Sequence, residues 1–114
     1  MSRDKAYLAD MLISARWAVE YLARKIQQDF YQDKQCQDAV IRRLEIIGEA
    51  ARRVSEQVRL SIPGVPWQSL IGMRNVLIHE YDGVDLDIIW ETVKRDLPGL
   101  ITSLESVVPA GDIS

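Results

Sequence analysis

The chain has almost none of the residues that build disulfides and metal sites. Its 114 residues include one cysteine, Cys36, and one histidine, His79. A single cysteine cannot form an internal disulfide and fits a reducing cytosol, and the polar surroundings of Cys36 favour an inert thiol over a nucleophile. One histidine and scattered acids do not form a ligand set of recognisable spacing, so we expect no metal and no other cofactor.

Long apolar runs and a basic surplus are absent as well. No run approaches the ~20 residues of a membrane helix, and the charged N-terminus has no apolar signal core behind it. We therefore expect a cytoplasmic protein without a membrane partner. The net charge of −3 argues against a general nucleic-acid binder, which usually carries excess Lys and Arg. A role with RNA would need a local basic patch or a catalytic pocket.

Strand patterns are missing, whereas apolar residues in the first half recur at alternating spacings of four and three. This spacing predicts helices over residues 4–28 and about 37–58, with a polar connection at 29–38. It places Ile26 at the end of the first apolar seam. The two apolar seams match, which predicts an antiparallel helical hairpin.

The second half of the chain predicts further helices. A Pro-Gly turn precedes Pro66, which suits the first position of a helix over 66–79. Asp85 is a suitable N-cap for a fourth helix, in which Pro98 either introduces a kink or starts a fifth helix.

These helices together predict an all-α fold, an antiparallel bundle of four to five helices. The length suits one domain over residues 1–114. We expect the tail, at about 109–114, to fray.

Two glycines, Gly48 and Gly72, lie inside predicted helices. Each costs about 1 kcal/mol relative to alanine. Such a cost is usually tolerated where another backbone comes close. The close partner is another helix of this chain, a second subunit or a ligand, and the sequence does not choose among them.

Arg74 has apolar residues at all four of its neighbouring helical positions, which are Leu70, Ile71, Leu77 and Ile78. An arginine in an apolar stripe is costly unless its guanidinium finds an acceptor. Two interpretations stay open. Either the methylenes of Arg74 cover apolar surface while its head group remains in water, or the guanidinium has a functional role.

His79 follows Arg74 by five residues, which is about 140° around an ideal helix and ~7.5 Å along it. The two side chains meet only if the helix loosens near His79 or the arginine swings round. Together they suit RNA cleavage by the adjacent 2′-hydroxyl, because an imidazole moves protons near neutral pH and a guanidinium stabilises charge on phosphate oxygens. A mechanism with two proton transfers needs a second proton-transferring group, which a symmetric homodimer would supply. The alternative for a lone His79 is a helix-end side chain bonded to a carbonyl.

Several separated motifs resemble one family. They are Ile46-Ile47-Gly48-Glu49-Ala50-Ala51, Ile62-Pro63 through Pro66-Trp67, Ile71-Gly72-Met73-Arg74-Asn75, His79-Glu80-Tyr81, and Val84-Asp85 through Ile89-Trp90. In this order and spacing they resemble the HepT-like branch of the HEPN superfamily, most strongly over about residues 38–100. The resemblance implies a helical bundle and a metal-independent ribonuclease whose cleft lies between two protomers. It also implies catalytic roles for Arg74 and His79, with Asn75 in support.

The resemblance further implies a toxin–antitoxin pair, in which a small nucleotidyltransferase of the MntA type silences the ribonuclease. That partner transfers AMP to the tyrosine two residues after the histidine, here Tyr81. A phosphate group beside Arg74 would occupy the anion pocket and repel RNA. The alternative for Tyr81 is a turn tyrosine that packs its ring on the bundle. Glu49 recurs in the motifs without a firm role, and two contacts stay open for it, one with a helix end and one with an arginine of the dimer.

Two other functions stay open. The first is a non-catalytic helical module that docks substrate or nucleotide for the nucleotidyltransferase, with Arg74 binding phosphate without turnover. The second is a purely structural homodimer. Three arginines, Arg42, Arg52 and Arg53, are either partners of nearby acids on a solvated face or part of a phosphate track.

Overall fold

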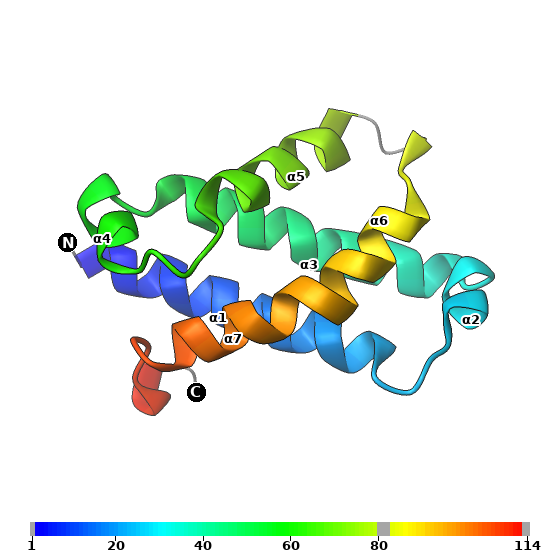
Figure 1. Cartoon of the computed structure of the whole chain (residues 1–114), viewed down its shortest axis with the longest axis horizontal. Coiled ribbons are helices and arrows are strands. Elements are labelled where there is room, and N and C mark those ends of the chain that lie inside the picture. The colour runs from blue at the N-terminus through cyan, green and yellow to red at the C-terminus, as the bar shows by residue number, and fades with distance from the viewer. Residues whose placement is uncertain (1, 80–82, 113–114) are drawn as a thin grey trace.

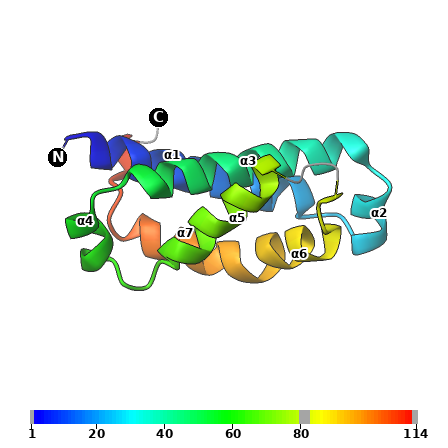
Figure 2. The ribbon, with the colours of Figure 1, turned by 90° about the horizontal axis from the view of Figure 1, so that it is seen from above.

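Long helical rods lie in two layers (Figures 1 and 2). They are α1 (Ser2–Leu22), α3 (Lys34–Arg53), α5 (Trp67–His79) and the continuous run of α6 (Leu86–Glu91), the π-helical segment η2 (Thr92–Asp96) and α7 (Leu97–Glu105). The computed structural model describes residues 2–79 and 83–112, and these residues contain no strand. The predicted all-α antiparallel bundle is confirmed.

Helices α1 and α3 form the predicted antiparallel hairpin and supply the centre of the core. Their seams meet through side chains that are almost fully buried, including Leu12, Leu22, Leu44 and Ile47. Because apolar residues recur every three or four positions, each helix presents one continuous stripe to the other. α7 packs on α1, whereas α5 packs on α3.

The first helix ends six residues before its predicted end at residue 28. α1 ends at Leu22, whose carbonyl oxygen accepts a 2.7 Å hydrogen bond from Lys94 Nζ. Ile26 is therefore not in the seam but 62% exposed. The predicted connection also contains a short helix, α2 (Gln27–Tyr31), which buries Phe30 against Trp90.

The second long helix also ends earlier than predicted, at Arg53 instead of about 58. Ser55 starts a separate short helix, α4 (Glu56–Ser61), by accepting a hydrogen bond from the N–H of Val58. Asp4 of α1 accepts from both the N–H and the hydroxyl of Ser55, at 2.9 and 2.8 Å. These hydrogen bonds satisfy the backbone N–H and the hydroxyl of Ser55 in a non-helical conformation, and this favours a break over a continuous helix.

The second layer follows the sequence closely. α5 begins one residue after Pro66, and Asp85 caps α6 by accepting from the N–H of Asp87. Pro98 lies in the first turn of α7, directly after η2. Proline lacks an N–H donor and would interrupt a regular α-helix. The wider π-helical turn before Pro98 allows the helical run to continue past it.

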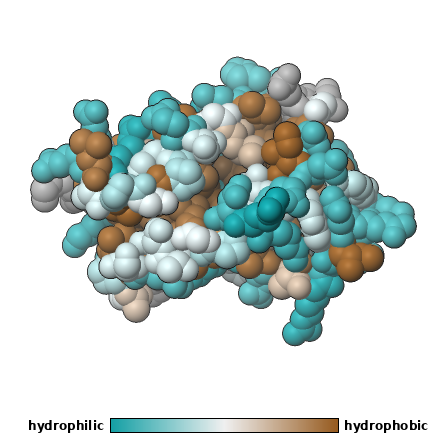
Figure 3. All heavy atoms as spheres, in the orientation of Figure 1, coloured by the Kyte–Doolittle hydropathy of each residue, from teal (hydrophilic) through white to brown (hydrophobic). Residues whose placement is uncertain are grey.

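Within the predicted tail, Ala110–Asp112 form the 3-10 turn η3, and the fraying of the tail stays a prediction. On the face shown in Figure 3, hydrophobic atoms are visible between α5 and α7 among hydrophilic ones. Among the described elements α5 packs mainly on α3, and residues of its outer face, including Gly72, Val76 and His79, are exposed.

Candidate functional site

Arg74 is located where α5 crosses α3 at Gly48. A Cβ added to Gly48 would lie 2.7 Å from the carbonyl oxygen of Leu70 and would also clash with the Cβ of Arg74. Only a glycine permits this approach, so the close partner of Gly48 is another helix of the same chain. The backbone contact fixes the base of the Arg74 side chain against α3.

Gly72 differs from Gly48 in this respect. A Cβ added there would meet no heavy atom within 4 Å beyond its own helix in the described part of the chain. Of the three partners that the sequence left open for Gly72, a helix of this protomer is therefore the wrong one. A second subunit and a ligand stay as predictions.

Glu49 is the anionic partner of the partly buried Arg74 side chain. Arg74 Nη2 lies 2.9 Å from Glu49 Oε1, an ion pair without the alignment of a hydrogen bond. The other carboxylate oxygen, Oε2, accepts hydrogen bonds from Arg52 Nη2 at 3.0 Å and Arg53 Nε at 2.7 Å. The side chain of Arg74 is only 23% exposed. Its head group is therefore paired and does not extend freely into water.

Three guanidiniums around one carboxylate define the electrostatics of this cluster. Hydrogen bonds from Arg52 and Arg53, helped by the charge of Arg74, lower the pKa of Glu49 to about 2. Glu49 is thus ionised throughout the physiological range. With three positive charges against one negative charge, the four side chains together carry +2. This is a local basic patch in a chain of net charge −3.

Asn75 makes a second contact with the same guanidinium. Arg74 Nη1 donates to Asn75 Oδ1 at 3.1 Å. The two terminal nitrogens of Arg74 therefore face two different oxygens, one from α3 and one from α5. The guanidinium has five N–H donors in a planar fork, so these contacts leave donors for a further anion.

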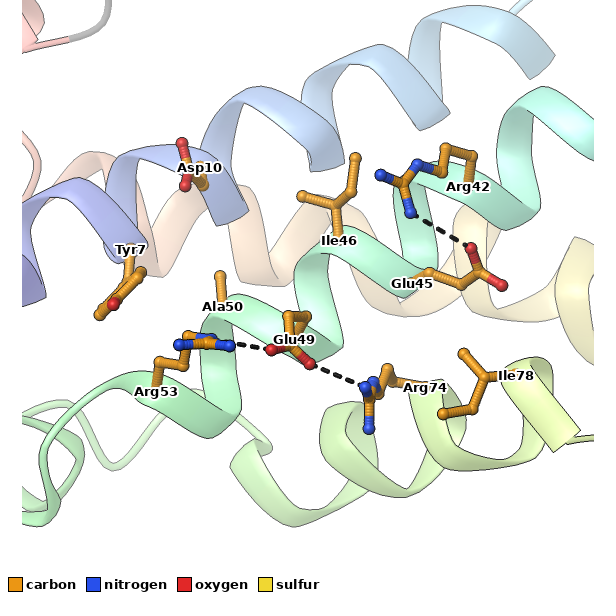
Figure 4. A pocket seen from close by; sticks show the side chains of 10 residues that line it. All are labelled: Tyr7, Asp10, Arg42, Glu45, Ile46, Glu49, Ala50, Arg53, Arg74 and Ile78. Atoms are coloured by element: carbon orange, nitrogen blue, oxygen red, sulfur yellow. Dashed lines mark hydrogen bonds and ion pairs between the residues drawn. The ribbon is translucent and has the colours of Figure 1, made fainter.

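A pocket of about 320 Å³ opens beside this cluster, between α1, α3 and α5 (Figure 4). It is lined by Tyr7, Asp10, Arg42, Glu45, Ile46, Glu49, Ala50, Arg53, Arg74 and Ile78. Figure 4 shows Glu49 between Arg53 and Arg74, while Arg42 pairs with Glu45 at 3.6 Å. The three arginines of the lining match its three acids in number, so the positive potential comes from the Glu49 cluster and not from the pocket as a whole.

Tyr7 extends the polar wall of the pocket toward the N-terminus of α1. Hydrogen bonds from Arg3 and Arg53 lower the pKa of its phenol. Neither Tyr7 nor Arg3 was a predicted site residue, because nothing in the sequence of α1 marks them as neighbours of α3.

His79 is not among the lining residues of the pocket. It is the last residue of α5 and is exposed. The helix stays regular up to this point, so the ideal offset from Arg74 applies, about 140° and ~7.5 Å. The protomer brings Arg74 and Asn75 together but does not bring His79 to them through any described contact. Tyr81, the predicted acceptor of AMP, lies outside the described residues.

Residues 2–79 and 83–112 contain no group of three or more His, Cys, Asp or Glu side chains close enough to hold a metal ion. None of the helices described there is long and apolar enough to cross a membrane.

The role of Glu49 was the main feature that sequence reasoning missed. One feature of the sequence pointed to such a role: Glu49 directly follows Gly48 in one of the motifs that resemble the HepT-like family. A carboxylate next to a close helix crossing is well placed to reach the facing helix, but the sequence alone does not say which residue lies opposite.

Comparisons with known proteins agree with the architecture and the motif. The family model "Ribonuclease HepT-like" matches residues 11–107. A protein of Methanocaldococcus jannaschii named "Putative RNase" is 42% identical over 103 residues, which cover 90% of this chain and 94% of that protein. A protein of Thermococcus cleftensis named "Probable ribonuclease HepT" is 40% identical over 103 residues, with the same coverage.

A bacterial relative extends the match. A protein of Caldanaerobacter subterraneus named "Putative RNase" is 35% identical over 108 residues, covering 95% of this chain and 96% of its own length. No solved structure matches the chain significantly. The helical bundle, the motif around Arg74 and these matches lead to one conclusion: the chain belongs to the HepT-like ribonuclease family of the HEPN superfamily.

Proposed function

We propose that the protein is a metal-independent endoribonuclease in which Arg74 and His79 are the catalytic residues and Asn75 supports Arg74. The observation that carries this proposal is the Arg74 guanidinium, held on the wall of a pocket by Glu49 and Asn75 within a cluster of net positive charge. A guanidinium held in a fixed orientation can stabilise the negative charge that develops on the phosphate oxygens in the transition state.

The reaction needs two proton transfers and no other reactant. A base takes the proton of the 2′-hydroxyl, and the 2′-oxygen forms a bond to the adjacent phosphorus. The bond from phosphorus to the 5′-oxygen then breaks, and an acid supplies a proton to that oxygen. The products end in a 2′,3′-cyclic phosphate and a 5′-hydroxyl. His79 serves as base or acid, and Arg74 binds the phosphate oxygens.

A homodimer completes this proposal. One protomer has a single histidine, which is exposed at the end of α5 and away from the pocket lining. A symmetric second copy docked across the C-terminal end of α5 would add its own Arg-His pair to a common cleft. The open space at Gly72 and the 48% exposure of Val76 support such a contact.

The proposed biological role is that of a cytoplasmic toxin paired with an antitoxin. A nucleotidyltransferase of the MntA type would silence the ribonuclease by transferring AMP to Tyr81. Tyr81 follows His79 by two residues, and an AMP phosphate bound by Arg74 would compete with RNA for the cationic cluster. Tyr81→Phe is expected to keep the fold and escape modification, and labelled AMP at the corresponding peptide of this variant would contradict the assignment.

A second function is favoured by one observation, the separation of His79 from the pocket that holds Arg74. A non-catalytic module that binds RNA or nucleotide for the nucleotidyltransferase would need only the arginine cluster. In that case RNA binds tightly and is not cut.

The deciding experiment is incubation of the purified protein with RNA in the presence of a chelator. We expect products that end in cyclic phosphate. Arg74→Ala is expected to slow cleavage by about 10²–10³-fold and His79→Ala by about 10²–10⁴-fold, with unchanged circular dichroism. Arg16→Ala is the matched control, because Arg16 of α1 also pairs with a glutamate, Glu105 of α7, and does not line the pocket. Unchanged cleavage by His79→Ala would overturn the catalytic assignment, and binding without products would favour the module.

A further inference from the structure

The carboxylate of Glu49 connects two helices at the pocket. Arg52 and Arg53 bond to Oε2 along α3, whereas Oε1 faces Arg74 of α5. The two intrahelical bonds hold the carboxylate in one orientation, because its Oε2 is fixed from two sides. Oε1 is buried and has no aligned hydrogen bond of its own among the described residues.

The neighbouring Gly48 adds a second, independent constraint. The backbone of α5 approaches α3 so closely at this glycine that Arg74 has little freedom at its Cβ. Arg74 is thus held at its base by the helix crossing and at its head group by Glu49 and Asn75. A long flexible side chain becomes a preorganised donor when both of its ends are fixed.

We propose that Glu49 is the positioning residue of the site: its carboxylate holds the Arg74 guanidinium in the orientation that receives the scissile phosphate. This inference rests on the proposed ribonuclease function. Arg52 and Arg53 belong to the same device, because they orient the carboxylate that orients Arg74.

The opposite role for this contact is also testable. A carboxylate beside an arginine competes with phosphate, so Glu49 would then act as an internal inhibitor that RNA has to displace. The two roles predict opposite signs. Removing the charge of Glu49 slows cleavage if Glu49 positions Arg74, and speeds it if Glu49 sequesters Arg74.

The experiment compares Glu49→Gln with Glu105→Gln. Glu105 is the matched control, since it also pairs with an arginine across two helices, Arg16 at 2.8 Å, and neither residue lines the pocket. For Glu49→Gln we expect kcat to fall by about 10- to 100-fold. KM should stay level or fall, because the cluster becomes more positive and attracts RNA more strongly. A purely structural role would not produce this split.

A double variant tests whether the effect passes through Arg74. Glu49→Gln added to Arg74→Ala should cause no further loss of kcat, since the group being positioned is gone. A full additional loss would overturn the proposal, as would an unchanged or increased kcat in the single variant. If Glu49→Gln fails to fold, Glu49→Asp is used instead, because it keeps the charge and shortens the reach by one methylene.

A readout independent of activity separates this proposal from the proposed function. ¹⁵N relaxation of the Arg74 Nε–H group reports how rigidly the guanidinium is held. We expect it to be rigid in the wild type and in Glu105→Gln and mobile in Glu49→Gln. An inactive wild type with this pattern contradicts the ribonuclease and keeps the positioning role. A mobile Arg74 in the wild type overturns the positioning role whatever the activity.

Discussion

The inner and outer faces of α5 differ in how firmly they fix a side chain. On the inner face, Leu70 and Leu77 are buried and Arg74 is paired with Glu49 across the crossing at Gly48. On the outer face, Gly72 has open space, and Val76 and His79 are exposed. The protomer therefore holds the proposed phosphate-binding group in place, while the proposed proton-transferring group lies on the exposed outer face.

The largest stability effect should come from the inner face. Gly48→Ala forces a methyl group into the backbone of α5 and the Cβ of Arg74, where neither neighbour can move cheaply. Overpacking of this kind costs about 1–3 kcal/mol, and we expect the upper end. Urea denaturation measures the loss, and a change below 0.5 kcal/mol would show that the crossing is looser than described.

A smaller effect is expected from the charge of Glu49. Because its folded pKa of about 2 is lower than the ordinary 4.5, its contribution to stability is fully present above pH about 4.5 and is lost as the pH falls toward 2. The pair is partly exposed and screened, so Glu49→Gln should cost only about 1 kcal/mol at pH 7. The difference between the two proteins should shrink on acidification, and a constant difference down to pH 2 would contradict the electrostatic explanation.

On the outer face of α5, the same kind of substitution should raise the stability of the protomer instead of lowering it. Gly72→Ala adds a methyl group in open space on a helix, which should stabilise the dilute protomer by roughly 0.5–1 kcal/mol. The same methyl group should weaken self-association if a second copy approaches there. Thermal unfolding and analytical ultracentrifugation read the two effects separately, and destabilisation of a monomer would mean that the glycine serves the fold of one chain.

The smallest effect belongs to His79. An exposed side chain at a helix end contributes little, so His79→Asn should change the free energy of unfolding by less than about 0.5 kcal/mol. Guanidinium denaturation at neutral pH is sufficient to check this. A larger loss would indicate that His79 is a structural residue bonded within the bundle.

The comparison also shows which features the sequence could predict. The alternating seams of α1 and α3 and the Asp85 cap are local or periodic, and they were confirmed. Ser55 was missed because apolar residues at Val54 and Val58 continue the helical pattern across the break. Ile26 was misassigned because α1 ends where Lys94, distant in sequence, binds the Leu22 carbonyl.

The site also has features that the sequence could predict and features that depend on tertiary contacts. The apolar neighbours of Arg74 indicate that it needs an acceptor, and periodicity is enough to see this. That the acceptor is Glu49 depends on the crossing of α5 over α3, a tertiary contact that periodicity does not contain. Asn75 is adjacent in sequence, so its contact with Arg74 is local. The roles of Arg74, His79 and Tyr81 in the reaction stay predictions.

One measurement tests most directly whether the two faces of α5 act on the same RNA. The chain has a single histidine, so its imidazole gives one unambiguous set of NMR signals. We predict that a cleavage-resistant 2′-O-methyl RNA shifts the His79 signals in the wild type and not in Arg74→Ala. RNA that binds the wild-type protein through Arg74 while the His79 signals stay unchanged would contradict a shared catalytic site.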